Sequence, residues 1–227
     1  MSINSINVLF LKLVKTAEED DEAFEKRIQL YKSKVGKHNK SMHHSNYYFD
    51  SGFDIFQPKR HDEILEKKTY KVDLGIQTAM YNINKEIHYH MIMPSFEKKD
   101  EWQDLNKWQE LVRFGMQEVE NFTEFCDAGQ AKPEPYVIHP RSSIYKKSFR
   151  LANNTGIIDT GYRGNLAAVI DNNNDFGKHS VENRNVLVEG ERYFQICRAD
   201  LQRFYIQMVE VLPKTSRGEG GFGSTGN

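Results

Sequence analysis

The sequence predicts an all-β protein, a sandwich or jelly roll built from many short strands. Short runs of β-branched and aromatic residues recur along the chain, and polar turns containing glycine, asparagine or proline separate them. Only two stretches carry the longer hydrophobic period of a helix. Residues 215–227 fit neither element, because ordering so many glycines costs too much backbone entropy.

Length and composition favour one soluble domain. The 227 residues suggest a large domain, or a domain with an insertion, and 38% hydrophobic residues suffice for a core. A net charge of −1 gives no general electrostatic attraction to nucleic acid. Cys126 and Cys197 lie far apart in the sequence and are expected to be buried thiols of a reducing compartment.

The first residues resemble no signal peptide, and the longest apolar run, 8–11, is too short to span a bilayer. We therefore expect an intracellular protein, cytoplasmic or nuclear, with no membrane contact and no secretion.

The N-terminal region predicts a strand over 8–15 and then a helix over about 18–34. Thr16 and Glu19 form the pattern of a capping box. The apolar face of the helix consists of Phe24, Ile28, Tyr31 and Val35. The polar stretch 36–45 is expected to be a mobile loop.

Two strands are predicted next, over 51–56 and 71–78. In the first, Asp54 points away from its neighbours Phe53 and Ile55. In the second, one face carries Val72, Leu74 and Ile76.

Residues 82–134 differ in character and read as an insertion. A short strand is possible over 88–93, and a helix over about 100–125 has an apolar stripe that includes two tryptophans. We favour packing of this stripe onto its own domain over a partner-binding surface. An extended linker over 132–135 closes the segment.

The remainder predicts a strand over 136–139 and a β-hairpin over 153–165. Asp159 and Tyr162 lie at the bend of the hairpin. A carboxylate there is costly unless water, a charge or a substrate meets it. Later strands are expected over 185–188, 193–196 and 204–212. Residues 1–214 thus form one β domain, and 215–227 a flexible arm.

Several stretches carry groups suited to phosphate. Arg141 offers a bidentate fork, and Ser142 and Ser143 add neutral donors. In the arm, Arg217 and Phe222 stand among glycines whose N–H groups can approach phosphate closely. Phe222 has no core of its own to join and could cover a base.

Other chemistries find little support. The sequence contains no Ser-His-Asp pattern, P-loop or Rossmann fingerprint. The histidine pairs 43–44 and 88/90 have no cysteines or acidic residues nearby at the spacing of a zinc site. Roles on the surface or in packing are therefore favoured.

Five stretches, in order, resemble the five motifs of the trimeric dUTP pyrophosphatase (dUTPase) family, an all-β jelly roll, or β-clip, fold. They are 51–55 (SGFDI), 140–143 (PRSS), 153–164, 190–195 (GERYFQ) and 217–226. The resemblance covers about 46–81 and 136–227, plus the first strand.

The resemblance implies Mg²⁺-dependent hydrolysis of dUTP to dUMP and pyrophosphate. Asp159 would activate the water that attacks the α-phosphorus, and Tyr162 would stack under the deoxyribose. The uracil edge would be read by Asn153 and by hairpin backbone that includes Gly156 and Ile158.

The same resemblance assigns the phosphates to Arg141, Ser142, Ser143 and Gln195. Mg²⁺ would be held by the triphosphate and by water, without direct protein ligands, and with Asp54 nearby. The arm of a neighbouring chain in a homotrimer with shared sites would close over the nucleotide with Arg217, Gly221, Phe222, Gly223, Ser224 and Thr225.

The chain departs from the family pattern at Ser51, where alanine is usual, and in two helical insertions, one at about 18–34 and one before Pro140 at about 100–125. One alternative is a nucleotide-sensing regulator that binds a protein partner through 95–130. A less favoured one is a dCTP deaminase, because Val169 stands where that family has a catalytic glutamate.

Overall fold

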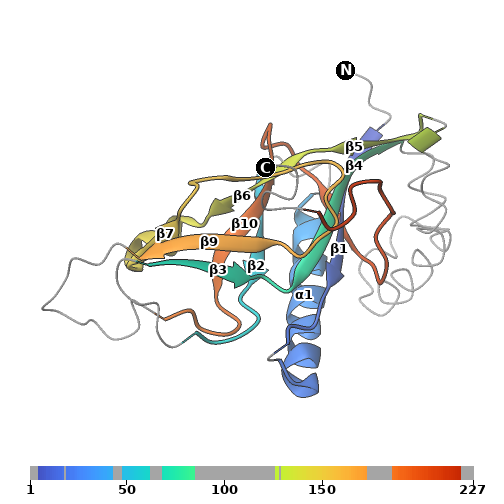
Figure 1. Cartoon of the computed structure of the whole chain (residues 1–227). Helices are drawn as coiled ribbons and strands as arrows, with labels where there is room; N and C mark the ends of the chain where they lie inside the picture. Colours follow the sequence, from blue (N-terminus) through green and yellow to red (C-terminus); the bar gives the residue numbers. More distant parts are fainter. Residues whose placement is uncertain are drawn as a thin grey trace, which may run out of the picture.

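The computed structural model describes residues 5–17, 19–42, 48–61, 68–84, 126–127, 129–172 and 186–220, and it is dominated by strands (Figure 1). One α-helix, α1 (Asp21–Ser41), accompanies them in these ranges, with a short 3-10 helix, η3 (Ser142–Lys146). The all-β prediction is confirmed. The strands are β1 (Ser5–Leu13), β2 (Gly52–Phe56), β3 (Thr69–Asp73), β4 (Ile76–Asn84), β5 (Ala131–Glu134), β6 (Tyr136–Pro140), β7 (Phe149–Leu151), β8 (Gly156–Ile158), β9 (Ala167–Asn172), β10 (Arg192–Arg198) and β11 (Tyr205–Met208).

The strands form three sheets. Their orders are β11-β1-β4-β5, β2-β10-β6-β8 and β3-β9-β7. All neighbouring strands are antiparallel except β1 and β11, which pair in parallel. The second sheet matters most for the predicted site. Its strands β2, β6 and β10 contain the predicted phosphate-binding motifs or end just before them.

Strand β1 is buried on both faces. Leu9 and Leu11 belong to the main core, whereas Val8 and Phe10 belong to a second cluster on the opposite face. The alternation follows from the period of two along a strand. A continuous apolar run, rather than alternation with polar residues, is typical of a strand covered on both sides.

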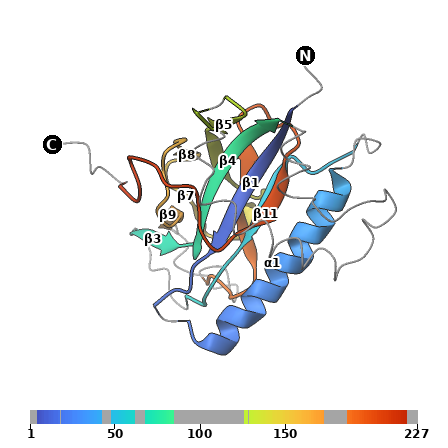
Figure 2. The same ribbon diagram turned by 90° about the vertical axis from the view of Figure 1, so that its right-hand side faces the viewer.

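Helix α1 runs alongside the sheet that contains β1 and β11 (Figure 2). The Asp20 side chain caps it by accepting from the Ala23 N–H at 2.7 Å. The predicted helix is therefore confirmed, but it begins at Asp21 and continues to Ser41, so the loop predicted from residue 36 is wrong as far as residue 41. Side chains in this last part make tertiary contacts that the sequence alone did not reveal.

Those contacts involve His38 and Asn39, which are both buried. The His38 ring pairs with the carbonyl of Phe204 at 3.0 Å. The Asn39 amide donates to the carbonyl of Ile206 and accepts from its N–H, each at 2.8 Å. Because β11 is an edge strand, Asn39 thus makes the backbone hydrogen bonds that a further strand would otherwise make.

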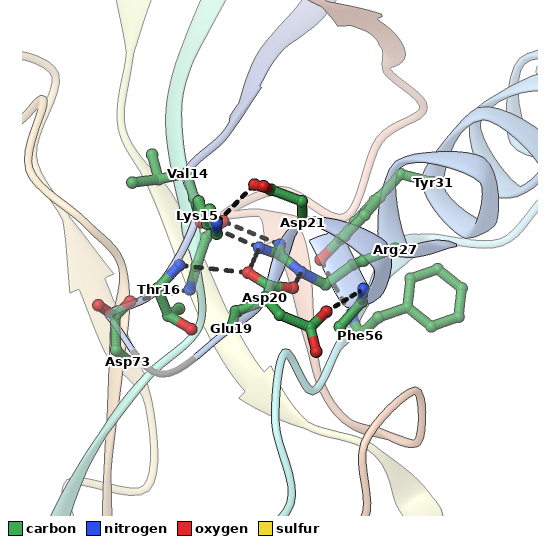
Figure 3. Close-up of polar contacts among 12 residues, drawn as sticks. Val14, Lys15, Thr16, Glu19, Asp20, Asp21, Arg27, Tyr31, Phe56 and Asp73 are labelled. Atoms are coloured by element: carbon green, nitrogen blue, oxygen red, sulfur yellow. Dashed lines mark hydrogen bonds and ion pairs between the residues drawn. The ribbon is translucent and has the colours of Figure 1, made fainter. Parts of the chain in front are cut away.

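The start of α1 is anchored by a buried ion pair (Figure 3). Arg27 makes two bonds of 2.7 Å to Glu19, and both side chains are at most 3% exposed. The guanidinium also donates to the carbonyls of Val14 and Gly75, at 2.9 and 3.0 Å. Glu19 in turn accepts from the N–H of Thr16, but the predicted capping box is wrong, because Asp20 caps the helix and the Thr16 hydroxyl has no hydrogen-bond partner among the described residues.

The strand predicted over 71–78 is wrong as a single element. It divides into β3 and β4 at Gly75, which has a φ of +63°. The Asp73 carboxylate accepts from the Gly75 N–H at 2.8 Å and stabilises the turn. Because the left-handed region favours glycine, this residue permits the break.

Other predictions are revised in extent. The linker predicted over 132–135 is largely strand β5, paired with β4. The strand predicted over 204–212 is β11 alone, and that over 185–188 is reduced to one bridge between His61 and Leu187. The predictions over 88–93 and 100–125 lie outside the described residues.

Both cysteines are free thiols. Cys197 is buried, as predicted, whereas Cys126 is only partly buried. Burial raises the pKa of Cys197 to about 11. No helix in the described ranges is long and apolar enough to cross a membrane.

We predict that Arg27→Met lowers the free energy of unfolding by about 3–5 kcal/mol, because it leaves the buried Glu19 carboxylate unpaired. Denaturant unfolding measures this. Lys15→Met is the matched control, since it breaks an ion pair to Asp21 whose acid is fully exposed, and no measurable change is expected. A loss below about 1 kcal/mol in Arg27→Met would contradict a role for the ion pair in holding α1.

We also predict an acid-sensitive contribution from His38. Burial lowers its pKa to about 4 from an ordinary value of 6.5. Between these pH values His38 is protonated in the unfolded chain but not in the native chain. The free energy of unfolding therefore falls as the pH drops from about 6.5 to 4, by on the order of 3 kcal/mol. His38→Gln keeps a donor for the Phe204 carbonyl and should flatten this dependence in denaturant titrations. Equal slopes in both proteins would show that His38 is not the titrating group.

Candidate active site

The predicted site residues gather around two acids. We call Asp159, Tyr162 and Arg217 the Asp159 group, and Asp54, Arg141 and Arg192 with Lys34 the Asp54 group. The first lies beyond the start of β6. The second lies at its other end, where Asp54 is level with His139 and Arg141 follows the strand. The register of β6 with its neighbours fixes both positions.

Asp159 directly follows β8, the edge strand of the second sheet. Ile158 is opposite Tyr136, the first residue of β6. The predicted hairpin is wrong in its pairing, because the following strand β9 pairs with β3 and β7 instead. The side chains of Ala168 and Ile170 on β9 enter the main core, and this burial outweighs a local hairpin.

Tyr162 is held in the loop that follows. Its hydroxyl donates to the carbonyl of Asn165 at 2.9 Å. A Cβ at Gly164 would lie 2.6 Å from the tyrosine oxygen, so only glycine allows this close approach. Partial burial raises the pKa of Tyr162 above its ordinary value.

Arg163 organises this loop, and sequence reasoning missed it. It is 7% exposed. Its guanidinium donates to the carbonyls of Thr160, Tyr162 and Pro213 and to the hydroxyl of Tyr81, at 2.8–2.9 Å. An arginine in a short polar loop with a glycine on either side, at 161 and 164, was the available signal. Arg163 joins the loop to β4 and to the start of the C-terminal arm.

The described base of the arm lies on the loop of its own chain. Thr215 donates to the carbonyl of Gly161 at 2.6 Å, and the carbonyl of Gly218 accepts from the Arg163 N–H at 2.8 Å. Arg217 pairs with Asp159. Its guanidinium carbon also lies 5.9 Å from the centre of the Tyr162 ring. Of the predicted arm residues, Gly221, Phe222, Gly223, Ser224 and Thr225 lie outside the described residues.

At the other end of β6, Asp54 is buried, with 6% of its surface exposed. Arg141 approaches one carboxylate oxygen at 2.7 Å, and Arg192 and Lys34 approach the other at 2.9 and 3.1 Å. Asp54 therefore pairs with cations from three segments. The arrangement carries two net positive charges.

The second sheet holds this group in register. Gln195 on β10 is opposite Asp54 on β2, and its amide donates to the carbonyl of Pro140 at 3.3 Å. A Cβ at Gly52 would lie 2.2 Å from the Gln195 oxygen, so the glycine of the first motif makes room for the glutamine of the fourth. Ser142 and Ser143 begin η3 directly after Arg141.

Asn153 and Gly156 lie between the two groups. Asn153 is exposed, and Gly156 is opposite Ile138 on β6. Thr155 approaches the His139 ring at 3.3 Å, which places this part of the chain towards the Asp54 end of β6. Residues 156–158 thus pair with the first three residues of β6 along the edge of the sheet, and 152–155 form a turn before them.

The distance between the groups follows from the register. Asp159 is level with the residue before β6, and Arg141 is the residue after it. At 3.3 Å per residue, the two positions are roughly 20 Å apart along the strand. Within one chain, the backbone positions of Asp159 and Arg141 are therefore well separated.

No group of three or more histidine, cysteine or acidic side chains that could hold a metal occurs among the described residues. The histidines at 43, 44, 88 and 90 and most of the segment 95–130 lie outside them. Val169, the residue that argued against a deaminase, is on β9, opposite Lys71.

Comparison with known proteins gives a consistent picture. A family profile described as dUTPase matches residues 126–226. A deoxyuridine 5'-triphosphate nucleotidohydrolase of Clostridioides difficile is 32% identical over 155 residues, which are 65% of this chain and 99% of that protein. The Crocosphaera subtropica protein of the same name is 42% identical over 90 residues, 39% of this chain and 58% of that protein.

The chain thus spans little more than half the length of the Crocosphaera relative. Among solved structures, a mutant dUTPase of Staphylococcus bacteriophage 80alpha with dUpNHpp aligns over 80% of this chain and 89% of that one, at 18% identity and a TM-score of 0.36. The match over 99% of the C. difficile protein, together with the profile match over 126–226, which contains four of the five motifs, shows that the chain belongs to the dUTPase family.

Proposed function

We propose that this protein hydrolyses dUTP to dUMP and pyrophosphate by attack of water on the α-phosphorus. The observation that carries the proposal is the division of the motif residues into an Asp159 group, with an accessible carboxylate, and a strongly cationic Asp54 group. Phosphoanhydride hydrolysis needs a positioned water and neutralised phosphate charge, and no covalent nucleophile. Family membership supports the same reaction.

In the proposed mechanism, Asp159 holds the attacking water and takes up its proton. Its side chain is 56% exposed, so water and substrate can reach it. In the ligand-free chain Arg217 pairs with this carboxylate. The phosphates of dUTP would compete for Arg217 and release the acid to act as a base.

The nucleoside would bind along β8. This strand is the edge of its sheet, and its free side leaves backbone donors and acceptors for the uracil edge at Gly156 and Ile158, with Asn153 beside them. Tyr162 would stack under the deoxyribose and leave no room for a 2′-hydroxyl. The bond from its hydroxyl to Asn165 fixes the ring for this purpose.

The triphosphate would bind the Asp54 group. Arg141 supplies a guanidinium fork, Ser142 and Ser143 supply hydroxyl donors, and Gln195 lies beside them on β10. Arg192 adds a further cation. Asp54 holds these cations in place from beneath.

The donor set fits a magnesium ion that arrives with the triphosphate. Mg²⁺ commonly keeps several waters and binds substrate phosphates with few protein ligands. Asp54 is the nearest acid, but both its oxygens already contact cations, so it would reach the ion only through water. When bound, the ion would neutralise charge on the phosphate oxygens.

A complete site would form between copies of the chain, which we propose to assemble as a homotrimer. The separation of roughly 20 Å between the two groups requires a second copy to bring an Asp54 group to an Asp159 group. The arm beyond residue 220 would close over the nucleotide from a neighbouring copy and exclude bulk water.

We predict that the purified protein with Mg²⁺ releases pyrophosphate from dUTP, and not from dCTP, dTTP or UTP. Asp159→Asn should lower kcat at least about 100-fold while dUTP still binds, because it removes the base and keeps the shape. Glu210→Gln, an exposed acid outside both groups, is the control and should leave kcat unchanged. No turnover of dUTP by the parent protein would refute the proposed reaction, and uracil formed from dCTP would favour the deaminase.

A mixing experiment tests the shared site. Asp159→Asn and Arg141→Met should each be inactive alone, yet regain activity when co-expressed. In randomly mixed trimers about a quarter of the sites would combine an intact acid from one copy with an intact arginine from another. Mixing each variant with itself is the control. No recovery in verified mixed trimers would place both groups within one chain's site.

A further inference from the structure

We propose that Lys34 of α1 is a further phosphate-binding residue of this active site, a third cation beside Arg141 and Arg192. The proposal rests on the proposed function, which supplies a polyphosphate substrate. It concerns a helix that lies outside the five motifs, and Lys34 matches none of them.

The first support is convergence. The ammonium nitrogen of Lys34 and a guanidinium nitrogen of Arg192 approach the same oxygen of Asp54, at 3.1 and 2.9 Å. They therefore lie within about 6 Å of each other, close enough for one polyphosphate chain to touch both. Arg141 approaches the second oxygen of the same carboxylate.

The second support is the charge balance. Three cations surround one acid, which leaves two positive charges in excess. The carboxylate side chain is only 9% exposed, whereas those of Lys34, Arg141 and Arg192 are 18%, 29% and 39% exposed. The acid thus lies beneath and the cations towards solvent. Partly buried like charges repel one another strongly, and a bound polyanion relieves that repulsion.

The third support is that α1 holds Lys34 rigidly in place. Arg27, two helical turns earlier, is locked by Glu19 and by two carbonyls (Figure 3). Between them, the Tyr31 hydroxyl accepts from the N–H of Phe56 at 3.0 Å, which joins α1 to β2, the strand of Asp54. Because residues seven apart share a helix face, the same contacts that dock α1 aim Lys34 at the site.

Pyrophosphate, with Mg²⁺, is the probe that tests this role independently of turnover. We expect Lys34→Met to weaken pyrophosphate binding at least tenfold in calorimetry and to raise KM for dUTP. Deoxyuridine, which lacks phosphates, should bind both proteins equally. Lys34→Arg should restore most of the pyrophosphate affinity, because it returns the charge.

Lys37→Met is the matched control, since Lys37 is exposed on the same helix, and it should leave pyrophosphate affinity unchanged. If Lys34→Met fails to fold, Lys34→Gln is measured with the same expectation. Unchanged pyrophosphate affinity in the folded variant would overturn the proposal. If the parent protein leaves dUTP intact while its pyrophosphate affinity depends on Lys34, the proposed function fails and this assignment stands.

Discussion

The buried carboxylate of Asp54 is the constraint on which the site depends. Placing an acid at 6% exposure costs several kcal/mol unless partners compensate it. Here the partners come from α1, from the residue after β6 and from β10. One acid on β2 therefore links a helix, the end of β6 and the start of β10, and it concentrates positive charge where a triphosphate would bind. Without the Asp54 carboxylate, the three cationic side chains would repel one another and move apart, so they would not remain positioned for substrate.

Strand β6 sets the second constraint. It is short and straight, with Asp159 level with the residue before it and Arg141 after it. The chain cannot fold the two groups together without breaking the pairing of β6 with both β8 and β10. The same pairing that stabilises the sheet thus separates the proposed base from the proposed phosphate site. Assembly of several copies is the remaining way to unite them, and this is a physical reason for a shared site.

Local hydrophobic period and turn residues predicted α1 and several strands, whereas the motif positions came from the resemblance to the family. The predictions were wrong where contacts between residues distant in the sequence determine the local structure. Gly75 breaks a strand that its neighbours favour, and His38 and Asn39 extend a helix whose polar sequence suggested a loop. Lys34 and Arg163 were missed for the same reason, since their roles depend on partners far away in the sequence. The motif residues were found early because the family pattern already contains their distant partners.

The two segments that depart from the family pattern enter the fold in different ways. The insertion begins after β4 and ends before β5, where Ile83 is opposite Ala131 and the Asn84 N–H donates to the carbonyl of Gln130 at 2.9 Å. Its ends are thus closed as a hairpin, and a loop of almost any length could join them at small entropic cost. Helix α1 instead joins β1 to the strand of Asp54 and is held by buried polar contacts at both ends. The fold therefore fixes α1 beside the cationic group, whereas the length of the insertion can vary without disturbing the sheet.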